Sequence, residues 1–263
     1  MTEAAHLDID GRGVAAITLN RPDVHNAFDD QLIAHLIGLI AQARNDARTR
    51  VLLLSSTGKS FSAGADLGWM RRMADASRED NLRDARNLAL LMETLNSFPA
   101  PTVAKVQGAV MGGGVGLVAC CDIAIASEAA FFALSEVKLG LAPAAISPYV
   151  IAKMGVSQAR RYFVSGERFS AIRAAAVGLV HEVVLAAELE AKVEHMLGTL
   201  LANGPLAMRA AKQLAQAANP LKVTPELSDY TAGVIADLRA SEEGKEGLRA
   251  FLEKSAPSWI VKD

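Results

Sequence analysis

The spacing of apolar residues changes along the chain, and each spacing predicts a different element. Residues 5–19 alternate loosely around a Gly-Arg-Gly turn at 11–13, which predicts a β-hairpin. From Asp29 onward, apolar residues recur every three or four positions, so we expect an amphipathic helix over 29–45 that Asp29 caps. The unbroken apolar run at 51–54 then predicts a short strand that is buried on both faces.

The rest of the chain continues this alternation and then changes to helices alone. In order, we expect a loop at 55–68, a helix at 78–97, a strand at 102–107, a helix ending near 120, and strands at 121–126 and 130–134. Past residue 145 we expect only helices, at 147–154, 157–164, 170–177, 186–203, 205–217, 223–239 and 242–253. This order predicts an α/β core followed by a helical C-terminal region.

Composition narrows the classes of protein that fit. Hydrophobic residues make up 51% and aromatic residues only 5%, which favours aliphatic helix packing over an all-β design. The net charge is −2 and the basic residues are scattered, so nothing indicates a nucleic-acid partner.

Location is predicted from three further features. The longest apolar stretch, 109–126, holds four glycines and is broken by Asp122, so it predicts no membrane span. The start of the chain shows no secretory signal pattern. The two cysteines, Cys120 and Cys121, are adjacent and form no disulfide framework. We therefore expect a cytoplasmic protein in a reducing compartment.

Two loops of small residues are candidates for a binding site. SFSAGADL at 60–67 and GAVMGGGVGL at 108–117 each follow a predicted strand and precede a predicted helix. Small side chains let a ligand approach the backbone, and N–H groups at a helix start have no intrahelical acceptor. Two such loops facing each other would present two N–H groups to one oxygen. The alternative interpretation is that each loop only solves a packing problem.

Several nucleotide and metal motifs are excluded. Residues 114–119 match the dinucleotide pattern G-x-G-x-x-A, but that fingerprint belongs in the first strand-helix unit of a fold. A phosphate-binding loop ending at Ser60 would need a glycine where Leu53 stands. The five histidines show no spacing typical of metal ligands, so we expect no metal site.

Glu136 is the candidate acid. It follows the short apolar strand at 130–134. An apolar setting would raise the pKa of its carboxyl and suit it to proton transfer near neutral pH. The alternative is an ordinary capping or surface carboxylate.

Five segments together resemble the crotonase (enoyl-CoA hydratase/isomerase) superfamily. They are LNRPDVHNAF (19–28), SFSAGADL (60–67), KVQGAVMGGGVGLVACCDIAIAS (105–127), FALSEVKLGLAP (132–143) and EEGKEGLRAFLEK (242–254). The resemblance implies an α/β fold, a spiral of ββα units with a helical C-terminal trimerisation region. We place the core with its CoA site at 1–200 and the C-terminal helical region at 201–263. It also implies a homotrimer or a dimer of trimers.

The resemblance also implies the chemistry of the site. Ala65 and Gly113 match the amides of the oxyanion hole, and Glu136 matches the second of two glutamates that the hydratases use. The substrate is an acyl-CoA thioester, which brings its own CoA, so no separate cofactor is expected. The substrate-binding set that it implies is Asn26, Ala27, Ala63, Ala65, Asp66, Leu67, Gly68, Gly113, Gly116, Phe251 and Lys254. In some members of the superfamily, the C-terminal stretch that matches Phe251 and Lys254 reaches the CoA of a neighbouring subunit.

Gly116 departs from the pattern of the two-glutamate hydratases, which carry their first glutamate at this position. Enoyl-CoA hydration is the preferred interpretation, and a Δ3-Δ2 isomerase and a non-catalytic CoA-binding scaffold stay open. The chain also resembles bacterial hydratases of leucine and acyclic-terpene breakdown, which act on 3-methylglutaconyl-CoA or carboxygeranoyl-CoA. We therefore hypothesise that Gly116 makes room for a branched or carboxylated acyl group.

Overall fold

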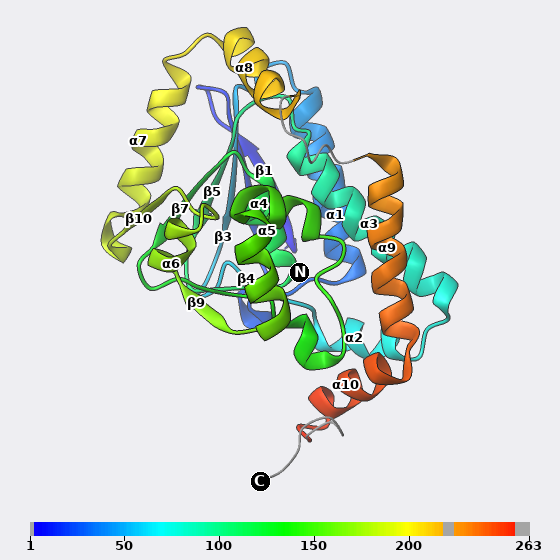
Figure 1. The fold of residues 1–263 in the computed structure, drawn as a ribbon. Helices are drawn as coiled ribbons and strands as arrows, with labels where there is room; N and C mark the ends of the chain where they lie inside the picture. Colours follow the sequence, from blue (N-terminus) through cyan, green and yellow to red (C-terminus); the bar gives the residue numbers. More distant parts are fainter. Residues whose placement is uncertain (1–2, 218–223, 256–263) are drawn as a thin grey trace.

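Two β-sheets lie at the centre of the computed structural model, which describes residues 3–217 and 224–255 (Figure 1). The six-stranded sheet has the order β1 (Ala5–Ile9), β2 (Val14–Leu19), β3 (Val51–Ser56), β5 (Thr102–Val106), β7 (Ile123–Ser127) and β10 (Glu182–Val184). The four-stranded sheet has the order β4 (Ser62–Ala63), β6 (Ala109–Met111), β8 (Phe131–Ala133) and β9 (Arg168–Ser170). The pairs β1–β2 and β8–β9 are antiparallel, and the other neighbours are parallel.

The chain winds as a spiral because successive strands alternate between the sheets. The pairs β3–β4, β5–β6 and β7–β8 each place one strand in the large sheet and the next in the small one. Helices follow each pair: α2 (Leu67–Ala74) and α3 (Arg78–Asn96), then α4 (Gly113–Cys120), then α5 (Ser147–Ser165). The expected spiral of ββα units is therefore confirmed.

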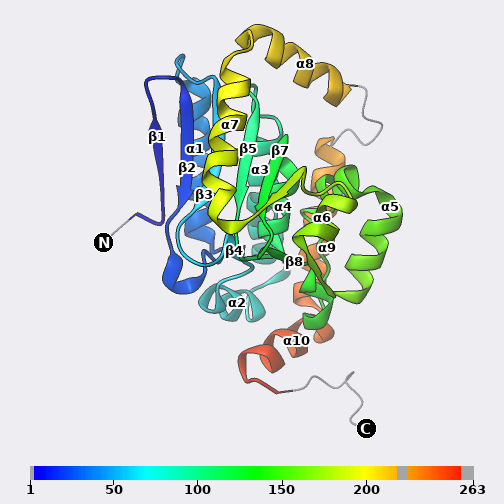
Figure 2. The same ribbon diagram turned by 90° about the vertical axis from the view of Figure 1, so that its left-hand side faces the viewer.

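Burial on both faces explains the unbroken apolar run of β3. Leu52 and Leu54 pack into the core with α1 (Asp30–Asn45), whereas Val51 and Leu53 pack against α7 (Leu189–Leu201). Figure 2 shows α7 and α1 on opposite faces of this sheet. A strand that is covered on both sides has no polar face, so it shows no alternation.

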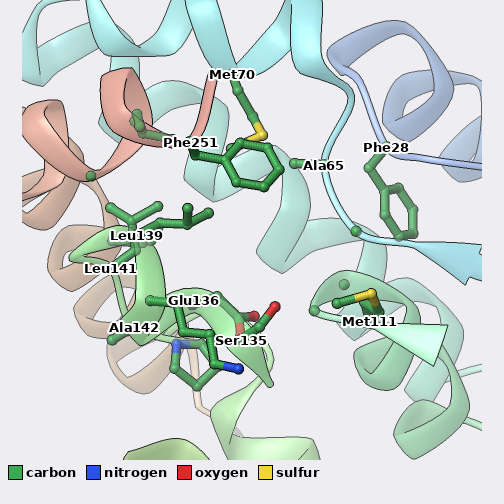
Figure 3. A pocket seen from close by; sticks show the side chains of 18 of the residues that line it. Phe28, Ala65, Met70, Met111, Ser135, Glu136, Leu139, Leu141, Ala142 and Phe251 are labelled. Carbon is green, nitrogen blue, oxygen red and sulfur yellow. The ribbon is translucent and has the colours of Figure 1, made fainter. Parts of the chain in front are cut away.

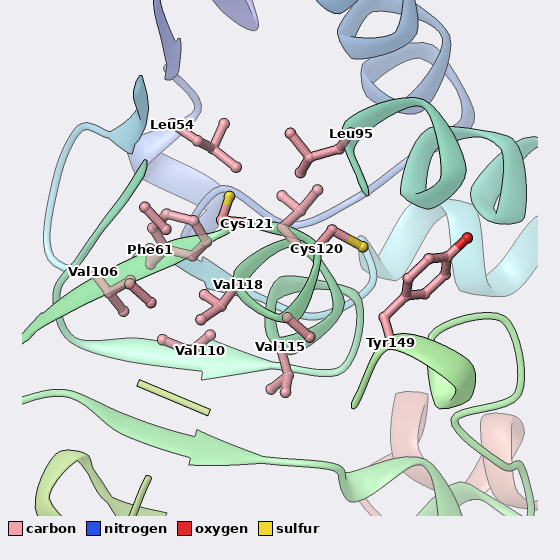
Figure 4. Packing of buried hydrophobic residues seen from close by; sticks show 14 of the residues in the cluster. Leu54, Phe61, Leu95, Val106, Val110, Val115, Val118, Cys120, Cys121 and Tyr149 are labelled. Atoms are coloured by element: carbon pink, nitrogen blue, oxygen red, sulfur yellow. The ribbon is translucent and has the colours of Figure 1, made fainter. Parts of the chain in front are cut away.

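The helix α4 is apolar all round because it runs through the core. Every residue from Gly114 to Cys120 is buried. Figure 4 shows Val115, Val118 and Cys120 among the surrounding core side chains. Burial raises the pKa of the adjacent Cys121 thiol to about 12, so neither proton transfer nor metal binding by its thiolate is favoured near neutral pH.

Three helices form the described part of the C-terminal region: α8 (Pro205–Ala217), α9 (Pro225–Ala240) and α10 (Glu242–Leu252). The helix α9 packs along α3, and α10 contacts α2, so this region covers one side of the molecule (Figure 1). None of the helices in the described part of the chain is long and apolar enough to cross a lipid bilayer.

Most predicted elements are confirmed, and the exceptions are short. Asp29 caps α1 by accepting a 2.7 Å hydrogen bond from the Leu32 N–H, and a left-handed Gly155 (φ 71°) separates the two halves of α5. The expectation of helices alone after residue 145 is wrong, since β9 and β10 lie there. The strands β4 and β6 and the helix α2 were also not predicted. Strands of two or three residues are too short to show a hydrophobic period.

Three short 3₁₀ helices and one short α-helix complete the described part. They are η1 (Pro22–Val24), η2 (Ser135–Leu139), η3 (Ala186–Glu188) and α6 (Ala171–Ala176). Of these, η2 matters most for the site because it carries Glu136.

Candidate active site

A cavity of about 600 Å³ lies between the end of the four-stranded sheet and the helices α2, α9 and α10. Its wall is mostly aliphatic or aromatic, and Figure 3 shows several of these side chains around the space. The large apolar residues in the wall are Phe28, Trp69, Met70, Met73, Leu88, Met111, Leu139, Leu141, Ile146, Ile235, Leu248 and Phe251. A mostly apolar cavity of this size is typical of a small-molecule site.

The two small-residue loops meet at this cavity. Strands β4 and β6, which lead into them, are neighbours, with Ala63 opposite Met111. A β-carbon on Gly112 would lie 3.9 Å from the Cα of Gly64, so the backbones are in close contact. The loops that the sequence places 48 residues apart thus form one continuous wall.

The direction of the Ala65 N–H follows from the hydrogen bonds of its neighbours. The Phe28 N–H donates to the Gly64 carbonyl (2.8 Å), and the Asp66 N–H donates to the Phe28 carbonyl (2.7 Å). In a trans peptide the N–H points opposite to the preceding carbonyl. Since no peptide bond in the described chain is cis, the Ala65 N–H points away from Phe28. Ala65 itself lines the cavity.

The Gly113 N–H points out of the start of α4 for the same reason. The Gly112 carbonyl accepts hydrogen bonds from the N–H groups of Val115 (2.9 Å) and Gly116 (3.2 Å), so it is directed into the helix. The following N–H is therefore directed out of the helix. No described residue accepts a hydrogen bond from this group or from the Ala65 N–H. Gly112 has a left-handed φ of 51°, which favours glycine.

The carboxyl group of Glu136 lies beside the same backbone. Its Oε1 is 3.2 Å from the point where a β-carbon on Gly112 would stand. Its Oε2 is buried and has no hydrogen-bond partner in the described part of the chain. Burial raises the pKa of Glu136 to about 7. No other acidic residue lines the cavity within residues 3–217 and 224–255.

Arg21 fixes the loop that carries Ala65. Its guanidinium forms ion pairs with Asp29 (2.7 Å) and Asp66 (3.3 Å). Asp66 also caps α2, accepting hydrogen bonds from the N–H groups of Gly68 (2.8 Å) and Trp69 (3.2 Å). This contribution of Arg21 was not predictable from the sequence, because its partners lie in two other segments.

The side chain of Asn26 is enclosed by the protein, and a contact of its loop with the substrate stays a prediction. Its amide donates to the carbonyls of Thr57 (2.8 Å) and Ser60 (2.9 Å), and its Oδ1 accepts from the Arg21 N–H (2.8 Å). It is fully buried and does not line the cavity, and neither does the buried Ala27. The side chain of Asn26 therefore joins two loops of the protein.

The expectation of vacant space beside Gly116 requires a correction. It is buried within α4 and does not line the cavity. A β-carbon there would stand 2.9 Å from the Cβ of Ile146 and 3.0 Å from the sulfur of Met92. The expected vacant space beside Gly116 is thus filled by Ile146, which lines the cavity in its place.

The other expected binding residues divide into two groups. Ala63, Ala65, Gly113, Glu136 and Phe251 line the cavity together. The remaining residues do not line it, and they are Asp66, Leu67, Gly68 and Lys254. Leu67 is half exposed and Lys254 is exposed, so both lie on the outer surface of the protein.

A buried ion pair next to the cavity was also not predicted; its Arg239 and the neighbouring Trp69 line the cavity, whereas Asp84 does not. Arg239 of α9 pairs with Asp84 of α3 at 2.7 Å. The indole N–H of Trp69 donates to the other carboxylate oxygen of Asp84 (3.1 Å), and the guanidinium lies 4.8 Å from the centre of the Trp69 ring. These residues belong to three separate helices, so no spacing in the sequence connects them.

Comparisons with known proteins agree on one family. The family model for enoyl-CoA hydratase/isomerase matches residues 10–262. The chain is 45% identical to an enoyl-CoA hydratase from Shewanella pealeana of known structure, with a TM-score of 0.81, covering 98% of this chain and 96% of that one. It is 32% identical to the 2,3-dehydroadipyl-CoA hydratase of Escherichia coli over 94% of both chains. It is 30% identical to the trans-2-decenoyl-[acyl-carrier-protein] isomerase of Streptococcus mutans over 95% of both.

Proposed function

Because the chain belongs to the enoyl-CoA hydratase/isomerase family of enzymes, we propose that it hydrates a 2-enoyl-CoA thioester to a 3-hydroxyacyl-CoA. One observation carries the proposal. Two backbone N–H groups and one buried carboxyl oxygen, Oε2 of Glu136, have no hydrogen-bond partner among the described residues and belong to the wall of a single apolar cavity. This combination suits a reaction that builds negative charge on one oxygen and moves one proton.

In this proposal the thioester oxygen accepts hydrogen bonds from the N–H groups of Ala65 and Gly113. As water adds to the β-carbon of the enoyl group, negative charge moves onto that oxygen, and the two donors bind it more strongly than in the ground state. One such donor contributes roughly 2.7–4 kcal/mol in comparable sites. Because both donors are backbone groups held by neighbouring hydrogen bonds, they need no reorientation during the reaction.

Glu136 moves the proton. Its carboxylate takes a proton from the attacking water as the carbon–oxygen bond forms, and the resulting carboxylic acid gives that proton to the α-carbon. The sum of the two transfers is the addition of one water molecule across the double bond. A pKa of about 7 means that both protonation states are accessible near neutral pH. Positioned acid–base catalysis contributes roughly 10²–10⁴ in rate.

The thioester supplies its own CoA, which we propose enters along the loop at 63–68. Asp66, Leu67 and Gly68 lie where this loop passes into α2, just outside the cavity. Phe251 of α10 lines the cavity of its own chain, and Lys254 lies three residues beyond it on the surface. Contact of this C-terminal stretch with CoA, and assembly into trimers, are parts of the same proposal.

Isomerisation of a 3-enoyl-CoA thioester is the second candidate. The observation that favours it is the position of Ile146, which fills the space beside Gly116 and leaves Glu136 as the one acid in the described cavity wall. One carboxylate is sufficient to move a proton between two carbons. The S. mutans relative carries the name of an isomerase.

Ultraviolet absorbance separates the two activities. Hydration of crotonyl-CoA consumes the conjugated enoyl thioester, so its absorbance falls, whereas isomerisation of 3-hexenoyl-CoA creates a conjugated thioester and its absorbance rises. We expect the fall. A rise with the second substrate and no change with the first would replace hydration by isomerisation. CoA binding by calorimetry with no turnover of either substrate would indicate a non-catalytic scaffold.

A further inference from the structure

The cavity wall offers few buried polar groups that lack a partner within the protein. Among the described lining residues, Glu136 has the one buried side-chain oxygen or nitrogen that lacks a hydrogen-bond partner. A site built for a polar acyl group would place further donors or acceptors where they could bind it. The part of the wall away from Glu136 therefore offers an acyl chain mainly apolar contacts.

Arg239 is the buried cation of this wall, and Asp84 cancels its charge. The two side chains are 9% and 10% exposed and lie 2.7 Å apart. The second oxygen of Asp84 accepts the Trp69 indole N–H, and the Trp69 ring lies against the guanidinium. None of these three side chains has a buried polar atom without a partner in the described chain. The Arg239 guanidinium is thus already paired with the Asp84 carboxylate and is not free to pair with a carboxylate of the substrate.

The other cations of the wall are placed differently. Lys138 and Arg168 line the cavity but are exposed to solvent, and Arg168 lies over the Phe131 ring at 4.9 Å. A charge in water is screened and selects weakly among ligands. Selection of the acyl group therefore falls to the enclosed part of the wall, where Arg239 lines the cavity and is paired with Asp84, which does not line it.

We propose that the enclosed part of the cavity accepts uncharged, apolar acyl chains and that Asp84, although it does not line the cavity, excludes a terminal carboxylate by neutralising Arg239, which does. The inference rests on the proposed function, because it concerns the acyl group of the same thioester. A carboxylate that entered beside Arg239 would lose its water, find the guanidinium already paired and lie close to the negative charge of Asp84. An alkyl end meets the flexible side chains of Met70 and Met73 instead, which adapt to apolar shapes.

Two substrates of equal length test the inference. 2-Hexenoyl-CoA and 2,3-dehydroadipyl-CoA share a six-carbon acyl chain and differ in whether it ends in a methyl or a carboxylate. We expect kcat/KM to be higher for 2-hexenoyl-CoA by on the order of tenfold or more. The E. coli relative is named for the carboxylated substrate, so the comparison is informative. A wild-type preference for 2,3-dehydroadipyl-CoA would overturn the inference.

The variant Asp84→Asn tests the role of the residue. It keeps the shape of the side chain and leaves the Arg239 charge without its counter-charge, so the ratio should fall by on the order of tenfold in favour of the carboxylated substrate. Asp80→Asn, on the exposed face of the same helix, is the matched control and should leave the ratio unchanged. An unchanged ratio in folded Asp84→Asn overturns the role of Asp84.

The outcomes remain distinct if the variant does not fold, because the wild-type ratio alone decides whether the cavity prefers apolar chains. In that case Arg239→Lys, which loses the stacking on Trp69 but keeps the positive charge, tests the charge pair by the same ratio and should preserve the wild-type preference. Loss of the preference in Arg239→Lys would overturn the assignment. If the wild type turns over neither substrate nor crotonyl-CoA, the proposed function fails rather than this inference.

Discussion

Ile146 occupies the space beside Gly116, with its Cβ 2.9 Å from the point where a β-carbon on residue 116 would stand. Gly116 lies in the buried helix α4, and Ile146 is the residue that caps the start of α5. As a result, the cavity wall is aliphatic at the place where the two-glutamate pattern has an acid. A carboxylate introduced at 116 would need Ile146 to move before it reached the cavity.

Gly116→Ala should lower the free energy of unfolding by about 1–3 kcal/mol, because the added methyl group overlaps Ile146 in a packed core. Urea denaturation measures this. The double variant Gly116→Ala/Ile146→Ala should lose less than the sum of its single variants, since the smaller side chain removes the overlap. Gly38→Ala is the control: it lies in α1 with nothing within 4 Å of the new atom. Equal losses in both glycine variants would contradict the overlap.

Glu136→Gln should lower kcat by at least about 10², because the amide cannot accept and return a proton. CoA affinity, measured by calorimetry, should stay close to the wild-type value, since Gln keeps the size of the side chain. Glu128→Gln, at an exposed position, should leave both quantities unchanged. Turnover that survives Glu136→Gln would remove this residue from the mechanism.

The pH dependence of activity follows from the raised pKa of Glu136. Hydration requires the carboxylate as the base, so kcat/KM should rise with pH through about 7 and level off above it. The measurement is a pH–rate profile with crotonyl-CoA across that range. An ordinary carboxyl would place the rising part near pH 4.5 instead, and a profile of that kind would show that Glu136 is not the group observed.

The same shift predicts a pH dependence of stability. Folding raises the pKa of Glu136 from 4.5 to about 7, so the folded protein holds a proton that the unfolded chain releases. This contribution is fully present below about pH 4.5 and is lost as pH rises to about 7, a change of about 3 kcal/mol. Glu136→Gln lacks it, so denaturation at several pH values should show wild type losing stability relative to the variant as pH rises. A constant difference would exclude the shift.

Asn26→Ala should destabilise the protein by about 2–4 kcal/mol, because it removes one acceptor and two donors that join two loops. Thermal denaturation measures the loss. Asn45→Ala, at an exposed position in α1, should have little effect. A variant with wild-type stability and a raised KM would instead restore the direct binding role that the resemblance implied.

Local features of the fold were predictable from local patterns. The cap at Asp29, the apolar run of β3 and the two small-residue loops each depend on neighbouring residues, and the structure contains all of them. Strands as short as β4 and β10 were not predictable, because they exist through pairing with distant segments. Trimer formation and a division of the chain near residue 200 stay predictions.

Most contacts between side chains within the site could not be predicted from the sequence. The missing side chain at Gly116 suggested vacant space, because Ile146, which fills that space, is 30 positions away in the sequence. Asn26 looked like a ligand contact because its motif lies in a loop, and only its three hydrogen bonds show that it is enclosed. The pairing of Asp84 with Arg239 crosses more than half the chain.

The orientation of the Ala65 N–H has a consequence for how this surface changes over generations. The Gly64 carbonyl sets that direction through the rigid peptide unit, so the side chain at 65 takes no part in it. Nineteen of the twenty amino acids carry the same donor, and proline alone removes it. Substitutions at residue 65 other than proline therefore change how the side chain fits its surroundings, while the backbone N–H donor is kept.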